Sequence, residues 1–136
     1  LEHGDGIIIA LAEVDAYTFT AQMIEPAAHK SAVHIGARVD LVFQESEVAL
    51  ARDLAGYISL SNRHAAKITQ MQSGELLCRV TLNFNGHSIV ALITQQSATR
   101  LQLKVGDDIE WLVKANEMLI APAITAENAL TEGANQ

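Results

Sequence analysis

The sequence contains an internal repeat with a period of 70 positions. Leu1–Ala51 aligns with Met71–Ala121 without a gap, and apolar and polar residues keep the same register over most of that length. The two copies match best where VHIGARVDLVFQESEVALA aligns with LKVGDDIEWLVKANEMLIA. Similarity at a fixed period indicates a repeated structural unit. The chain therefore holds two copies of one small unit, and comparing them separates residues that the fold needs from residues that a ligand needs.

The composition narrows the class of protein. The 136 residues suit one domain or two mutually supporting units, because units of about 65 residues are marginal alone. Half of the residues, 49%, are hydrophobic but only 4% are aromatic, so the core must be mainly Val, Ile, Leu and Ala. A net charge of -7 with nine Lys and Arg argues against a surface for nucleic acid or anionic lipid.

Two weaker features indicate the cellular location of the chain. The longest apolar run, Ile7–Ala12, is too short to cross a bilayer. The single cysteine, Cys78, excludes an internal disulfide and fits a reducing compartment, and it lies in an alternating stretch that predicts a small core residue. We therefore expect a soluble, cytoplasmic chain. Its start at Leu1 without methionine suggests a fragment of a longer polypeptide.

Most of the chain alternates with a period of two, which predicts β-strands. Leu76–Phe84 and His87–Thr94 flank Asn85-Gly86, a dipeptide typical of a two-residue hairpin turn. In the first copy Ile7–Val14 and Tyr17–Met23 flank Asp15-Ala16 in the same layout. The other expected elements are one helical turn in each copy, at 95–100 and 25–30, and the strands Asp108–Lys114, Arg38–Phe43, Met118–Ile120, Val48–Leu50 and Ala66–Met71.

Five short strands with one helical turn, repeated, predict an all-β fold of two tandem small five-stranded barrels of the oligonucleotide/oligosaccharide-binding (OB) type. The expected boundaries are a degenerate first barrel at 1–56, a complete second barrel at 57–121 and a flexible tail at 122–136. The counterpart of the second copy's leading strand would precede Leu1. We therefore expect upstream residues or another chain to supply a strand, and this favours a homodimer.

Three polar residues of the second copy are replaced in the first: Thr94, Ser97 and Lys114 align with Ile24, Ala27 and Gln44. Two hydroxyls and a cation suit a small oxyanion, because hydroxyls donate hydrogen bonds and the cation offsets the loss of hydration. The alternative is that all three are solvated residues at strand ends. The sequence has neither a metal-ligand spacing nor a catalytic constellation, so we expect no metal, no cofactor and no enzyme activity in this chain.

The second copy resembles a known family, the TOBE or molybdate-binding Mop domain. The segment VALITQQSATRLQLKVGDDIEWLVKANEMLI follows the family pattern of Ile-Thr-x-x-Ser, Leu-x-x-Gly, and an apolar strand that ends in Lys-Ala. Upstream, SLSNRHAAKIT occupies the place of the family's Ser-x-Arg-Asn segment and the strand after it. The resemblance covers about Ser59–Ala121, and the first copy follows the pattern more loosely.

This resemblance implies paired barrels that bind molybdate or tungstate between them. The residues that it assigns to the oxyanion are Ser59, Ser61, Asn62, Arg63, Thr94, Ser97, Lys114 and Ala115. Ser61 departs from the family, which usually has arginine there, and Arg63 is the candidate substitute cation.

A degenerate copy followed by a complete copy is similar to the C-terminal region of the ATP-binding subunit of molybdate ABC importers. By this resemblance the chain is a regulatory domain that senses intracellular oxyanion, and its partners are an ATPase domain, a membrane permease and a second copy, with no nucleic acid. Two alternatives stay open: an assembly module that dimerises an ATPase and binds nothing small, and the paired-Mop part of a molybdate-responsive transcription regulator. The sequence leaves open which oxyanion is preferred and how many sites a dimer has.

Overall fold

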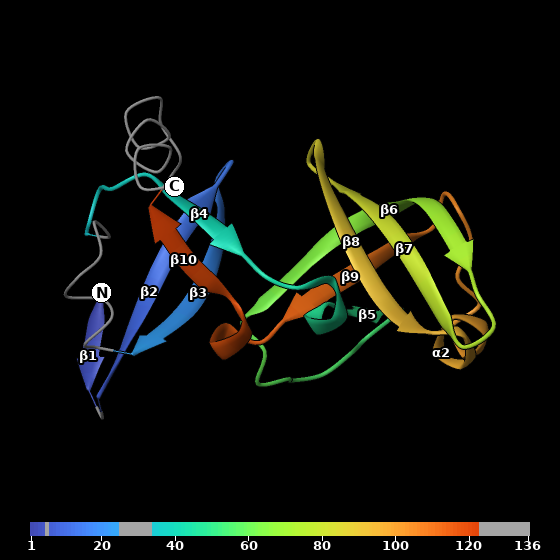
Figure 1. Cartoon of the computed structure of the whole chain (residues 1–136), viewed down its shortest axis with the longest axis horizontal. Coiled ribbons are helices and arrows are strands. Elements are labelled where there is room, and N and C mark those ends of the chain that lie inside the picture. The colour runs from blue at the N-terminus through green and yellow to red at the C-terminus, as the bar shows by residue number, and fades with distance from the viewer. Residues whose placement is uncertain (5, 25–33, 123–136) are drawn as a thin grey trace, which may run out of the picture.

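The computed structural model describes residues 1–4, 6–24 and 34–122, and antiparallel strands dominate these ranges (Figure 1). The strands are β1 (Glu2–Gly4), β2 (Ile7–Val14), β3 (Tyr17–Ile24), β4 (Val39–Val42), β5 (Ala49–Ala51), β6 (Asn62–Ser73), β7 (Leu77–Phe84), β8 (His87–Thr94), β9 (Asp108–Val113) and β10 (Leu119–Pro122). One α-helix, α2 (Gln95–Arg100), and two 3₁₀ turns, η1 (Glu45–Glu47) and η2 (Ala115–Glu117), complete the described part. The all-β prediction is confirmed.

Local sequence explains why these strands form. In β7 the side chains of Cys78, Val80, Leu82 and Phe84 point into the core, and the residues between them are more exposed. Cys78 is fully buried, as its place in the alternating pattern predicted.

Both predicted hairpins are present. Asn85 and Gly86 take positive φ angles of 49° and 89°, and Asp15 and Ala16 take 49° and 73° at the equivalent turn. Two successive positive φ angles match the twist of the flanking strands, which is why Asn-Gly is favoured there. The helix at 95–100 also has the predicted bounds. The predicted turn at 25–30 lies outside the described residues.

The second repeat contributes four strands to a five-stranded sheet in the order β5-β9-β6-β7-β8. Its long strand β6 pairs with β9 through its first half and with β7 through its second half, with a register shift between Ile68 and Gln70. Such a shift bends a strand, and here it lets the sheet curl into a half-barrel. The predicted leading strand, Ala66–Met71, is the central part of β6.

The two repeats exchange their last strands. β5 comes from the first repeat but pairs with β9 of the second, and β10 comes from the second repeat but pairs with β4 of the first. Figure 1 shows the exchange: β5 lies with the β6–β9 sheet, and β10 lies beside β4. Val48 and Met118, which occupy equivalent repeat positions just before these strands, are 2% and 0% exposed. Each repeat is therefore anchored in the other.

The first barrel is open among the described residues. β1 pairs with β2 in the register in which the end of β6 pairs with β7, so Glu2 opposite Ile9 repeats Gln72 opposite Arg79. Between β2 and β4 the described chain provides no counterpart for the rest of β6, and a groove of about 740 Å³ lies along these strands. A degenerate first barrel was expected. The boundaries at 56 and 57 stay a prediction, and nearly all of the predicted tail (123–136) lies outside the described residues.

Candidate functional site

Thr94 and Ser97 form a hydroxyl pair at the start of α2. Thr94 ends β8 opposite Leu77, and its Oγ1 accepts a hydrogen bond of 3.1 Å from the backbone N–H of Ser97. Threonine is a favoured N-cap residue for this reason. The two hydroxyl oxygens lie 2.9 Å apart. The structure therefore brings together two of the predicted ligand residues.

Arg100 joins this pair, and sequence reasoning missed it. Its Nη2 atom lies 3.4 Å from the Oγ of Ser97, one turn earlier on α2. The signal was available in principle, because residues three apart on a helix are neighbours. We call Thr94, Ser97 and Arg100 the hydroxyl cluster.

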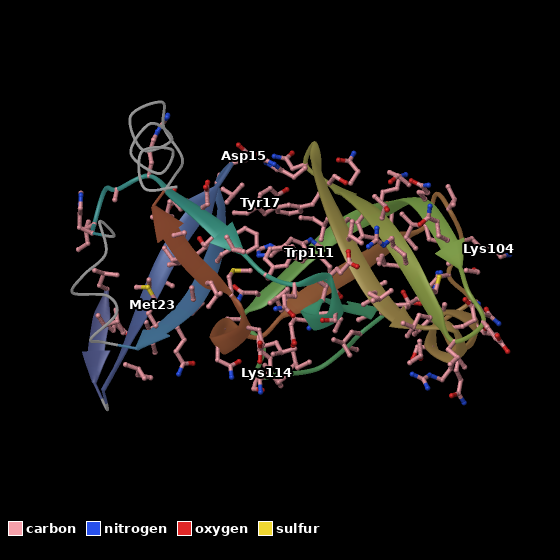
Figure 2. All side chains as sticks on the ribbon, viewed as in Figure 1. Asp15, Tyr17, Met23, Lys104, Trp111 and Lys114 are labelled. Carbon is pink, nitrogen blue, oxygen red and sulfur yellow. The ribbon has the colours of Figure 1, made fainter. Side chains whose placement is uncertain are left out.

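Lys114 lies in a second polar group, at the end of β9. It is exposed and comes just before η2, and η2 packs against β3 of the first repeat. Figure 2 shows Lys114 below the junction of the two repeats. Half-buried Ala115 follows Lys114, and exposed Ser61 precedes Asn62, which pairs with Val113. Ser59, also exposed, lies two residues before Ser61 in the chain. We call Ser59, Ser61, Lys114 and Ala115 the lysine cluster.

The two clusters lie at opposite ends of the second barrel. Thr94 pairs with Leu77 at the start of β7, beside the C-terminal end of β6. Lys114 follows Val113, which pairs with Asn62 at the N-terminal end of β6. A 12-residue strand spans roughly 35 Å when straight, at about 3.3 Å per residue. The structure therefore does not bring Lys114 to the Thr94 and Ser97 hydroxyls within one chain.

The side-chain amide of Asn62 makes its hydrogen bonds within the fold. Its side chain is 1% exposed, and its Oδ1 accepts a bond of 2.7 Å from the Thr20 N–H. Its Nδ2 donates a bond of 2.8 Å to the Thr20 carbonyl. One amide thus satisfies both backbone groups of a residue in the first repeat, and this ties the two repeats together.

The guanidinium of Arg63 also makes its hydrogen bonds within the fold. Its guanidinium donates to both carboxylate oxygens of Glu110, at 2.5 and 3.0 Å, and to the Leu54 carbonyl at 2.6 Å. These hydrogen bonds lower the pKa of Glu110 and raise the pKa of Arg63. Because a carboxylate neutralises it locally, Arg63 has little charge left to offer an anion.

An aromatic junction joins the two repeats. The His64 ring lies between Tyr17 and Phe19 of the first repeat and Phe84 and Trp111 of the second, with centroid separations of 4.4 to 5.9 Å. Burial lowers the pKa of His64, and a hydrogen bond to the Thr18 backbone opposes that shift. Figure 2 labels Tyr17 and Trp111 on the two sides of this junction.

The hairpin tips meet beside this junction. His87 Nε2 lies 2.7 Å from an Asp15 carboxylate oxygen, and Asn85 donates a bond of 3.2 Å to the same oxygen. The hydrogen bond from His87 is the main cause of a lowered pKa at Asp15. Sequence reasoning did not predict this contact, because it depends on how the two hairpins are placed.

Neither a cluster of metal ligands nor a membrane-spanning helix is found in the parts of the chain that the structure covers. No three His, Cys, Asp or Glu side chains gather there in a way that could hold a metal ion. No helix in those parts is long and apolar enough to cross a membrane.

Two small antiparallel barrels that exchange strands and carry polar side chains at the barrel ends define a binding module of the OB-like type. Residues 58–120 match the family model described as TOBE domain. The second repeat therefore matches the TOBE domain family, as the resemblance predicted.

Curated proteins with similar sequences are named for molybdenum import. The chain is 33% identical over 106 residues to proteins named "Molybdenum import ATP-binding protein ModC" from Brucella abortus (strain 2308) and Brucella suis biovar 1 (strain 1330). The match covers 77% of this chain and 28% of each relative, so the chain spans less than a third of the length of these curated relatives.

A solved structure supports the fold. The molybdate-bound crystal form of ModG, described as a cytoplasmic molybdate-binding protein, aligns with a TM-score of 0.85 at 21% identity. The alignment covers 90% of this chain and 89% of ModG. The predicted fold of paired OB-like barrels is thereby confirmed.

Proposed function

We propose that this chain is a regulatory module that binds molybdate or tungstate. The observation that carries the proposal is that the TOBE repeat has the paired hydroxyls of Thr94 and Ser97 and an exposed Lys114 at the family's ligand positions. The first repeat has Ile24, Ala27 and Gln44 at the equivalent positions. The hydroxyls can donate hydrogen bonds to the oxyanion oxygens, and the ammonium of Lys114 can offset their charge.

The parent protein in this proposal is the ATP-binding subunit of a molybdate importer. Support comes from the ModC relatives, which match 77% of this chain. The chain itself is a binding domain. An ATPase domain elsewhere in the polypeptide, a membrane permease and a cytoplasmic location complete the proposal, and the same relatives favour an importer over a transcription regulator.

The geometry favours a site assembled from two copies of the chain. Because one barrel separates the hydroxyl cluster from the lysine cluster, a ligand that touches both must take them from different molecules. Both clusters are accessible for this, since Thr94 and Lys114 are exposed. A homodimer with two such sites would be stabilised by the oxyanion, and this paired arrangement could slow transport when the cell is replete.

Isothermal titration calorimetry with molybdate, tungstate and sulfate tests binding directly. We expect saturable heat with molybdate or tungstate. Absence of heat with all three anions at concentrations up to millimolar would reject the proposal.

Mixing two variants tests whether the site is shared. Ser97→Ala damages the hydroxyl cluster and Lys114→Ala damages the lysine cluster, so each homodimer should bind weakly. After subunit exchange, a mixed dimer has one site with both defects and one intact site, and tight binding should return to a fraction of the protein. If the mixture binds no better than the separate variants, the two-copy site is wrong.

The second candidate is an assembly module without a small ligand. It is favoured by the separation of Lys114 from the hydroxyls and by the neutralisation of Arg63 by Glu110. In that case Lys114→Ala should leave both the mass in solution and the response to molybdate unchanged.

A further inference from the structure

Carboxylates neutralise half of the lysine and arginine side chains in the described ranges. Four described cations pair with carboxylates: Arg52 with Asp107, Arg63 with Glu110, Lys67 with Asp108, and Arg79 with Glu45. Arg100 pairs with no carboxylate among the described residues, and its side chain reaches the Ser97 hydroxyl instead. A guanidinium free of carboxylates therefore lies in the hydroxyl cluster.

The hydrogen bonds within the cluster leave some of its donors unused. Ser97 Oγ is approached by the Thr94 hydroxyl at 2.9 Å and by Arg100 Nη2 at 3.4 Å. An oxygen that accepts from two donors keeps its own O–H free to donate elsewhere. The Ser97 hydroxyl and the remaining N–H groups of Arg100 are then available to one acceptor.

We propose that Arg100 is an oxyanion-binding residue that supplies the guanidinium missing at Ser61, but from the hydroxyl cluster. This inference rests on the proposed function. The guanidinium stays charged at every physiological pH and offers several N–H donors in a fixed plane, a geometry that suits two oxygens of one anion. The family's arginine, at the position of Ser61, would lie in the lysine cluster of one chain. Arg100 instead supplies its guanidinium from the hydroxyl cluster of the other chain.

The distinction from a structural role is measurable. A cation in the last turn of a helix also interacts favourably with the helix dipole, so Arg100 could serve α2 alone. That role would show in thermal stability and leave anion affinity unchanged. An anion-binding role would show in affinity, with little change in the thermal midpoint, because the Arg100 side chain is exposed.

The experiment compares the full chain with Arg100→Gln and Arg100→Lys in calorimetric titrations with sodium molybdate. Arg100→Gln should weaken binding about tenfold or more, the scale expected when a charge-assisted hydrogen bond is lost. Arg100→Lys should fall between, because it keeps the charge and loses the planar fork. Lys104→Gln is the matched control: it removes one charge from an exposed residue whose N–H, not its side chain, bonds Asp107.

Mixed dimers test whether Arg100 acts together with the hydroxyl cluster of its own chain. Arg100→Gln should be rescued by Lys114→Ala chains, which carry an intact hydroxyl cluster, and not by Ser97→Ala chains, which do not. Rescue by Ser97→Ala chains would overturn the placement.

The outcomes separate this inference from the proposed function. If Ser97→Ala weakens molybdate binding but Arg100→Gln does not, the inference fails and the proposed function stands. If the unmodified chain gives no heat with molybdate, both fail. Equal weakening by Lys104→Gln would show only a general charge effect and would also overturn the inference.

Discussion

At the scale of single residues, His64 is the described side chain whose protonated form is most directly disfavoured by burial in the fold. Burial among aromatic rings disfavours the imidazolium and lowers the pKa of His64 below its usual 6.5. The unfolded chain therefore binds a proton at this residue more readily than the folded chain does. Stability from the neutral ring is fully present above about pH 6.5 and is lost as the pH falls through the lowered pKa.

Replacing His64 by Phe should remove this pH dependence. The free energy of unfolding, measured by urea titration at several values between pH 7 and pH 5, should fall with pH more steeply in the unmodified chain than in His64→Phe. His34→Gln, a change at an exposed histidine, should follow the unmodified chain. If both variants track it in parallel, the junction does not carry the effect.

The same scale shows where sequence reasoning about the site reaches its limit. Thr94 and Ser97 were predicted from the comparison of the two repeats, and because they lie three residues apart, local structure sets their contact. Asn62 and Arg63 carry equally suitable polar groups, but the structure uses them against Thr20 and Glu110, more than 40 positions away. Residue type and local spacing cannot report a partner at that distance.

At the scale of elements, the exchanged segments hold the repeats together through buried anchors. Met118 precedes β10 and is fully buried, whereas Leu119, the first residue of β10, is 56% exposed opposite Val42. Met118→Ala should lower the free energy of unfolding by about 2–5 kcal/mol, because it leaves a cavity in the core. Leu119→Ala, the neighbouring control, should cost less than about 1 kcal/mol. Urea unfolding checks both, and equal costs would contradict the anchoring role of Met118.

Alternating patterns predicted these strands well but not their partners. The strand pairs beside Asn85-Gly86 and Asp15-Ala16 were predicted almost to the residue, because a two-residue turn fixes the partner as well as the strand. β5 and β10 have no such turn. A period of two states which face of a strand is buried, but not which neighbour it joins, so the exchange became visible only in the structure.

At the scale of the whole molecule, the exchange makes two repeats into one structural body. The core cluster contains Phe19 and Ala21 of the first repeat together with residues of the second, such as Trp111. If one repeat unfolded alone, the exchanged strand of the other repeat would lose its pairing partner and become exposed. This argues that the divergence of the first repeat was tolerated because the second supports it.

Unfolding should therefore be a single cooperative transition. Hydrogen exchange of the β7 and β8 amides reports the second barrel, and hydrogen exchange of the β2 and β3 amides reports the first. Both should give the same urea midpoint. Asn62→Ala should lower both midpoints together, by the equivalent of about 1–3 kcal/mol, because it leaves the partly buried Thr20 N–H and carbonyl without their partner. Asn116→Ala, at an exposed residue of η2, is the control and should move neither. If the first repeat opens at lower urea than the second, or if Asn62→Ala shifts only one midpoint, the repeats are separate folding units, and the exchanged strands dock after each has folded.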